Sequence, residues 1–174
     1  DDHSRFVCVY FLRQKSDAPS KIRNYVSQLN KLINGQDSQL PRIVGTLHTD
    51  NAGEFLSREF TEFLDSELIA HTTCPPHVHE LNGIAERAIR AVVENMRSNL
   101  NMSKAPPSFW NYVAEHSADV LNRTTGPPGS DRSSHELLTG EKPRILPIQP
   151  FGCRAWAVKP RVAYSKTSIQ DHGW

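Results

Sequence analysis

Short apolar runs alternate with segments of helical periodicity along this chain, and this alternation constrains the fold more than any other feature. Residues 5–13 (RFVCVYFLR) are rich in Val, Tyr and Phe and too short for a typical helix, so they predict a buried strand. Residues 42–49 and 69–74 predict two more short strands. Amphipathic helices are expected between and after these runs. This order predicts an α/β layered domain.

Four helices are predicted from apolar residues that recur at three- and four-residue steps. The first has Ser16 or Asp17 available as a cap and Gly35 at its end, and Ser57 opens the second. The third runs from residue 83 to about 102, and the fourth begins near residue 108. The residues expected to face inward are Ile22, Tyr25, Val26, Leu29, Leu32 and Ile33; Phe60, Phe63, Leu64 and Leu68; Ile89, Val92, Val93, Met96 and Leu100; and Trp110, Val113, Ala114 and Leu121.

The composition changes after Arg123, where Gly, Pro and Ser dominate the stretch TTGPPGSDRSS. Such a stretch is typical of a linker or a domain boundary. We therefore expect a core domain over residues 1–123 and a linker with a post-core segment over residues 124–174. That segment contains a predicted short helix at 134–140 and a strand-like run at 153–158.

Composition excludes several classes of protein. The net charge is +1, so any nucleic-acid surface has to be local. Three scattered cysteines without a C-x-x-C pair predict neither a disulfide framework nor a zinc ribbon, and they favour a reducing compartment. No apolar stretch approaches the roughly 20 residues of a membrane span, so we expect no membrane partner. The chain opens without Met, within an apolar pattern, and we expect it to be an excerpt of a longer protein.

Two acids stand in contexts that suggest chemistry. Asp50 follows directly on the predicted strand 42–49, where a side chain can point into a cleft. Glu86 lies in the first turn of the long third helix, and the 35 residues 51–85 separate the two acids. The helix dipole alone favours a carboxylate at such a position, so a purely structural role for Glu86 is the alternative.

Several phrases of the chain resemble the integrase catalytic core of copia-type retrotransposon Pol polyproteins, a member of the retroviral integrase group. The phrases that carry this resemblance, in order, are DDHSRFVCVYFLRQKS, HTDNAGEF, NGIAER, PPSFWNYVAEHSADVLNRT and HELLTGEKPRILPIQPFGCRAWAV. The resemblance implies a ribonuclease H-like three-layer fold with a mixed central sheet. Here that fold would be truncated at its N-terminal edge and followed by a short post-core tail.

The implied function is DNA integration: metal-dependent 3′-end processing and strand transfer of element DNA into target DNA. The family uses two aspartates and a glutamate to hold two Mg²⁺ (or Mn²⁺) ions, which stabilise the attacking and leaving oxygens of the displacement. Asp50 and Glu86 are the implied catalytic residues and metal ligands. Asn82, Gly83, Arg87 and Arg90 are the implied DNA-binding residues, although the two arginines also suit a solvated helix face.

The implied third acid has no clear counterpart. Asp1 and Asp2 precede the first strand, but the phrase DDHSR resembles a later strand junction of the family. We therefore expect the ligand-bearing strand to lie upstream, and the chain itself to be inactive. The alternative is a non-catalytic nucleic-acid-binding remnant of such an integrase. The complete enzyme implies DNA and a homo-multimer as partners, and localisation to the nucleus and cytoplasmic virus-like particles rather than secretion.

A histidine pair and one further acid also bear on the metal chemistry of the chain. His77 and His79 form an H-x-H pair in a loop, but no second ligand pair stands nearby at zinc spacing, so we predict no zinc site. His79 and Leu81 also depart from the residues usual in the family loop. Glu54, four residues after Asp50, is interpreted as a solvated acid near a helix start or as an outer-shell group of the metal site.

Overall fold

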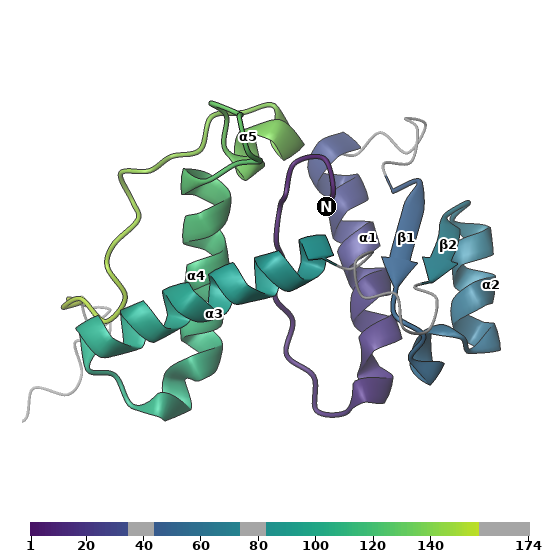
Figure 1. Cartoon of the computed structure of the whole chain (residues 1–174), viewed down its shortest axis with the longest axis horizontal. Helices are drawn as coiled ribbons and strands as arrows, with labels where there is room; N and C mark the ends of the chain where they lie inside the picture. Colours follow the sequence, from purple (N-terminus) through teal and green to yellow (C-terminus); the bar gives the residue numbers. More distant parts are fainter. Residues whose placement is uncertain (35–43, 74–82, 157–174) are drawn as a thin grey trace, which may run out of the picture.

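The computed structural model describes residues 1–34, 44–73 and 83–156. Its two strands form one sheet, and its α-helices flank the sheet or lie beside it (Figure 1). The elements are η1 Lys15–Asp17, α1 Ala18–Asn34, β1 Thr46–Thr49, η2 Gly53–Phe55, α2 Arg58–Ser66, β2 Ala70–Thr73, α3 Gly83–Ser103, η4 Pro107–Phe109, α4 Trp110–Thr124 and α5 Ser134–Thr139.

The sheet and helices α1 and α2 share one hydrophobic core. Strands β1 and β2 pair in parallel, with Thr46 opposite Ala70 and Thr49 opposite Thr73, and α2 forms the connection between them. Phe60 and Leu64 of α2 are buried with Val26 of α1 and with Ile69, which directly precedes β2. Ser57 caps α2 as predicted, since its hydroxyl accepts the N–H of Phe60 at 3.4 Å.

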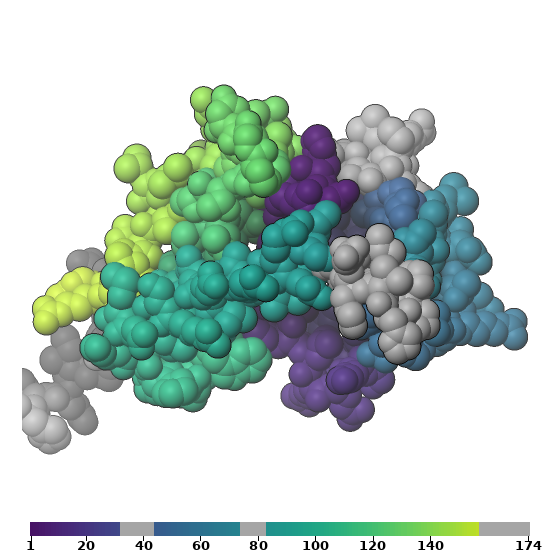
Figure 2. All heavy atoms as spheres, in the orientation of Figure 1, coloured from purple at the N-terminus to yellow at the C-terminus, as the bar shows by residue number. Residues whose placement is uncertain are grey.

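Helices α3 and α4 form the second packed unit. Val92 of α3 and Val113, Ala114 and Ala118 of α4 are buried. The small side chains on α4 allow close approach of the two helices, and the amide of Asn99 donates to the Ser117 hydroxyl across the interface at 3.3 Å. In the space-filling view α3 crosses the front of the molecule, and the N-terminal residues reach the surface between α3 and α5 (Figure 2).

The prediction of a strand at residues 5–13 is wrong for this structure. The segment has no regular secondary structure and belongs to no sheet, and the sheet of the described residues contains only β1 and β2. A strand requires a neighbouring strand for its backbone groups. Here the side-chain amide of Asn122 takes that place: Val7 N–H donates to Asn122 Oδ1 at 2.8 Å, and Asn122 Nδ2 donates to Val7 O at 2.7 Å. Asn122 is buried on α4 and so fixes this segment against the helix.

Three residues predicted to face inward are exposed. Leu68 lies beyond the end of α2 with φ of 56° and is 81% exposed, since the helix stops before its next turn. Ile89 of α3 is 63% exposed and Trp110 is 53% exposed, because no described element covers the side of the helix that they occupy. Trp110 still makes an edge contact with Phe11, with ring centroids 5.2 Å apart.

The segment after α4 matches the prediction in part. Helix α5 forms as expected, capped by the Ser133 hydroxyl and ended by Gly140 at φ of 77°. Residues 153–156 form no strand, and the rest of the predicted run lies outside the described residues. Gly35, the predicted end of α1, also lies outside them. The boundary after residue 123 stays a prediction. None of the described helices is both long and apolar enough to cross a membrane.

Candidate functional site

Asp50 follows β1 directly, as predicted, at the carboxyl end of the parallel pair. Ligand sites of α/β sheets form at this end, because the strands there deliver loops to a common edge. The Asp50 side chain is exposed, and its Oδ1 accepts the N–H of Ala52 at 3.3 Å. That bond holds the turn after the strand. No hydrogen bond to the second carboxylate oxygen comes from residues 1–34, 44–73 or 83–156.

The residues beside Asp50 form two polar cross-strand pairs. On one face of the sheet, His48 Nδ1 and Thr72 Oγ1 are 2.9 Å apart. On the other face, Thr49 Oγ1 and His71 Nε2 are 2.8 Å apart. The Thr49 hydroxyl also donates to the backbone carbonyl of Asp50 at 2.9 Å. The backbone at the strand end is therefore connected to the neighbouring strand through side chains.

Glu86 lies in the first turn of α3, which begins at Gly83 as predicted. Its side chain is exposed, and the positive end of the helix dipole favours its charge. Arg87 lies back over the same turn, since a Cβ built on Gly83 would come within 3.6 Å of its Nη1. Arg90 is exposed one turn further on. Asn82 lies outside the described residues.

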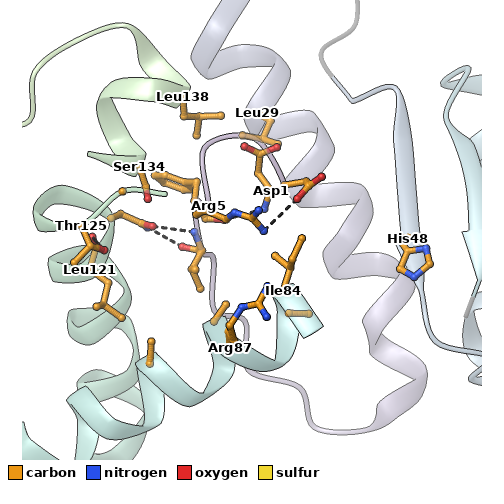
Figure 3. Close-up of a pocket in the computed structure, with 18 of the residues that line it drawn as sticks. Asp1, Arg5, Leu29, His48, Ile84, Arg87, Leu121, Thr125, Ser134 and Leu138 are labelled. Carbon is orange, nitrogen blue, oxygen red and sulfur yellow. Dashed lines mark hydrogen bonds and ion pairs between the residues drawn. The ribbon is translucent and has the colours of Figure 1, made fainter. Parts of the chain in front are cut away.

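A cavity of about 840 Å³ lies between the N-terminal segment, α1, the β1 region, the first turns of α3, the end of α4 and α5 (Figure 3). It is lined by Gly45, Thr46, Leu47 and His48 of the β1 region and by Ile84, Ala85 and Arg87 of α3, among others. The side chains of Arg5 and Arg87 reach into it from opposite walls (Figure 3). The strand before Asp50 and the helix turn that carries Glu86 thus border one space, although neither carboxylate is among the lining residues.

Asp1 and Asp2 also line this cavity, but both make local contacts. Asp1 accepts the N–H of Ser4 at 2.7 Å and also the Ser4 hydroxyl, and Asp2 forms an ion pair with Arg5 at 3.1 Å. These contacts close the turn at residues 1–5. They give both carboxylates a structural role, and the location of the third metal ligand stays a prediction.

Asp50 and Glu86 have the right chemistry to bind Mg²⁺, but they are too few to hold two ions. Carboxylate oxygens are the hard donors that Mg²⁺ binds. Among the described residues, however, no group of three or more His, Cys, Asp or Glu side chains is placed to hold a metal ion. Asp50 and Glu86 therefore do not amount to a complete two-metal site. His77 and His79, for which no zinc site was predicted, lie outside the described part of the chain.

The pKa values of Cys8 and Tyr25 are both raised. Desolvation raises the pKa of the Cys8 thiol, and it also raises the pKa of Tyr25, which hydrogen-bonds Cys8. Both groups remain protonated at neutral pH, so neither provides a nucleophile or a base.

The contacts of Thr49, His71 and Asn122 were missed by the sequence analysis. The repeated His-Thr of LHT and AHTT was the available signal, but its meaning depends on the strand register.

Comparison with curated proteins relates the chain to retrotransposon polyproteins. It is 32% identical over 171 residues, 98% of its length, to the retrovirus-related Pol polyprotein from transposon TNT 1-94 of Nicotiana tabacum. It is 28% identical over 172 residues, also 98% of its length, to the Pol polyprotein from transposon RE2 of Arabidopsis thaliana. The chain spans only 12% and 11% of these two relatives. No protein-family model matches it.

Comparison with solved structures identifies the fold. A chain of the simian T-cell lymphotropic virus intasome in complex with PP2A regulatory subunit B56 gamma superposes with a TM-score of 0.59 at 19% identity, covering 87% of this chain and 48% of that one. The HTLV-2 integrase catalytic core domain in complex with magnesium, in its dimeric form, gives 0.50 at 20% identity, covering 72% and 70%. The predicted ribonuclease H-like α/β class is confirmed; one parallel strand pair represents its sheet among the described residues.

Proposed function

We propose that this chain is the counterpart of the integrase catalytic core in the Pol polyproteins of copia-type retrotransposons, and that it belongs to an enzyme of DNA integration. The complete enzyme would trim the 3′ ends of element DNA and join them to target DNA. The observation that carries this proposal is the placement of Asp50 at the carboxyl end of β1, a strand that borders the same cavity as the first turns of α3, the helix of Glu86.

Asp50 and Glu86 are proposed as two ligands of a divalent-metal site, with Mg²⁺ or Mn²⁺ as the ion. When bound, two such ions stabilise the charge on the attacking and leaving oxygens of a phosphodiester. The described residues hold too few ligands for that site. We attribute the shortfall to a strand of the longer protein. The cavity beside β1 supports this account, because it offers space for an added strand.

The test of this proposal is strand transfer with a labelled DNA end in Mg²⁺ or Mn²⁺. The 174-residue chain is compared with a form extended upstream by the adjoining sequence of its gene. We expect activity only in the extended form, abolished by Asp50→Asn and by Glu86→Gln. Asp65→Asn on α2 and Glu94→Gln on α3 are the controls, since both remove an exposed carboxylate and should retain activity. Activity of the extended form that survives Glu86→Gln would refute the assignment.

DNA contact is proposed for the exposed start of α3. Arg87 and Arg90 place two guanidinium groups on the helix of Glu86, where phosphates of the substrate would lie, and Asn82 and Gly83 are proposed to contact DNA just before them. Arg90→Gln should weaken binding of duplex DNA at every sequence and reduce the slope of log K against log salt by about 0.9. Arg58→Gln on α2 is the matched control. An unchanged slope for Arg90→Gln would remove Arg90 from the DNA surface.

A non-catalytic remnant that still binds DNA is the second candidate. It is favoured by the incomplete ligand set among the described residues. It predicts salt-dependent DNA binding by both forms of the chain and strand transfer by neither. For the complete enzyme we further propose a homo-multimer that holds two DNA ends. In this chain we propose a core over residues 1–123 and a post-core segment over residues 124–174. We propose that the enzyme functions in the nucleus and in cytoplasmic virus-like particles.

A further inference from the structure

The backbone at Asp50 is held by a chain of two side-chain hydrogen bonds that begins on the neighbouring strand. Thr49 Oγ1 donates its hydrogen to the Asp50 carbonyl oxygen at 2.9 Å. A hydroxyl has one hydrogen, so the 2.8 Å contact between Thr49 Oγ1 and His71 Nε2 requires His71 to be the donor. The sequence of donors is therefore His71, then Thr49, then the carbonyl of Asp50.

Both side chains of this relay are themselves fixed. Thr49 is 9% exposed, and its β-branched side chain has few rotamers in a strand. The imidazole of His71 stands edge-on to the ring of Phe60, with centroids 6.1 Å apart and planes at 90°. Phe60 is fully buried in the core between α2 and the sheet. The relay therefore connects the peptide of Asp50 to the hydrophobic core.

We propose that His71 and Thr49 are positioning residues for Asp50. They fix the orientation of the peptide plane that follows the Asp50 Cα, while the Ala52 N–H fixes carboxylate oxygen Oδ1 from the other side. Together these bonds hold the second carboxylate oxygen in one direction before any ligand arrives. This inference rests on the proposed role of Asp50 as a metal ligand. Loss of such a supporting contact weakens a metal site about 10- to 100-fold in comparable proteins.

The second His–Thr pair provides a matched control. His48 and Thr72 are joined at 2.9 Å on the opposite face of the same two strands, and Thr72 donates to the carbonyl of Leu47 rather than to Asp50. Thr72→Val therefore removes the same hydroxyl, from the same sheet, without touching the relay. Thr49→Val removes the relay hydroxyl and keeps the shape. Thr49→Ser restores the hydroxyl, and His71→Phe keeps the ring but removes the donor.

The experiment is nuclear magnetic resonance on the 174-residue chain with ¹³C and ¹⁵N labels. Without metal, the carbonyl carbon of Asp50 should shift in Thr49→Val and in His71→Phe, and stay in place in Thr49→Ser and Thr72→Val. The Mn²⁺ concentration that half-broadens the Asp50 signals should rise about 10-fold in the first two variants and less than twofold in the others. The double variant should be no worse than either single one.

Equal effects of Thr49→Val and Thr72→Val on the Asp50 carbonyl and on the Mn²⁺ midpoint would overturn the proposal, since both hydroxyls would then be merely structural. An unshifted Asp50 carbonyl in Thr49→Val would overturn it as well. Asp50→Asn separates this inference from the proposed function. If that variant leaves the Mn²⁺ response unchanged, Asp50 is not a metal ligand, and the relay is then judged from the carbonyl shifts in the absence of metal.

Discussion

The attachment of the N-terminal segment to α4 depends on one side chain, and this dependence can be measured. Asn122 makes two hydrogen bonds to the backbone of Val7, at 2.8 Å and 2.7 Å, from a buried position. Each such bond contributes about 0.5–1.5 kcal/mol net, and the groups of Val7 that lose a partner remain partly buried, which adds to the cost. We therefore expect Asn122→Ala to lower the free energy of unfolding by about 2–3 kcal/mol.

The assay is urea denaturation followed by circular dichroism. With an m-value of about 2 kcal/mol/M, the expected loss moves the midpoint down by about 1 M. Amide exchange of Val7 should also accelerate, because its N–H loses its acceptor. Asn111→Ala, on the same helix, should move the midpoint by less than about 0.3 M, in line with a substitution outside any special contact. A midpoint for Asn122→Ala that equals that of Asn111→Ala would refute the reasoning.

Three more predictions concern the core, the titration of the chain and one turn. Phe60→Ala should cost about 3–5 kcal/mol, because the ring is fully buried, whereas Phe109→Ala, at 45% exposure, should cost less than half as much in the same denaturation assay. Stability should fall as pH rises above about 9, because the pKa values of Cys8 and Tyr25 are raised on folding and the unfolded chain ionises first. Tyr25→Phe should flatten the upper part of that decline, as followed by pH titration of the urea midpoint. Gly140→Ala should cost about 1 kcal/mol, since φ is 77°, and should lower the melting temperature; no change would contradict the strain argument.

The sequence predicted the elements whose signals are local. Helical periodicity placed α1, α2, α3 and α4 within a few residues, and Ser57 marked the start of α2. The position of Asp50 at the end of β1 followed from a short apolar run that ends in a turn. In each case the information lies within one helix turn or one strand of the residue concerned.

The features that the sequence did not predict depend on distant partners. The segment at residues 5–13 has the composition of a strand, but a strand forms only where another strand is available, and here Asn122 is the partner instead. Likewise, Ile89 and Trp110 follow the apolar periodicity of their helices, but no described element covers them. The relay from His71 to Asp50 depends on which residue of β2 lies beside Thr49, which no local pattern states.

The two His–Thr pairs also determine how the strands are aligned. His48 with Thr72 on one face and Thr49 with His71 on the other are both satisfied in the observed alignment of β1 and β2. A slip by one residue would turn the side chains of one strand to the opposite face, and a slip by two would move Thr72 away from its position opposite His48. These four polar side chains thus stabilise the observed register of the two strands. A parallel pair with only four residues in each strand has few backbone hydrogen bonds that resist slipping. The two His–Thr pairs therefore also determine the position of Asp50, at the end of β1, relative to β2.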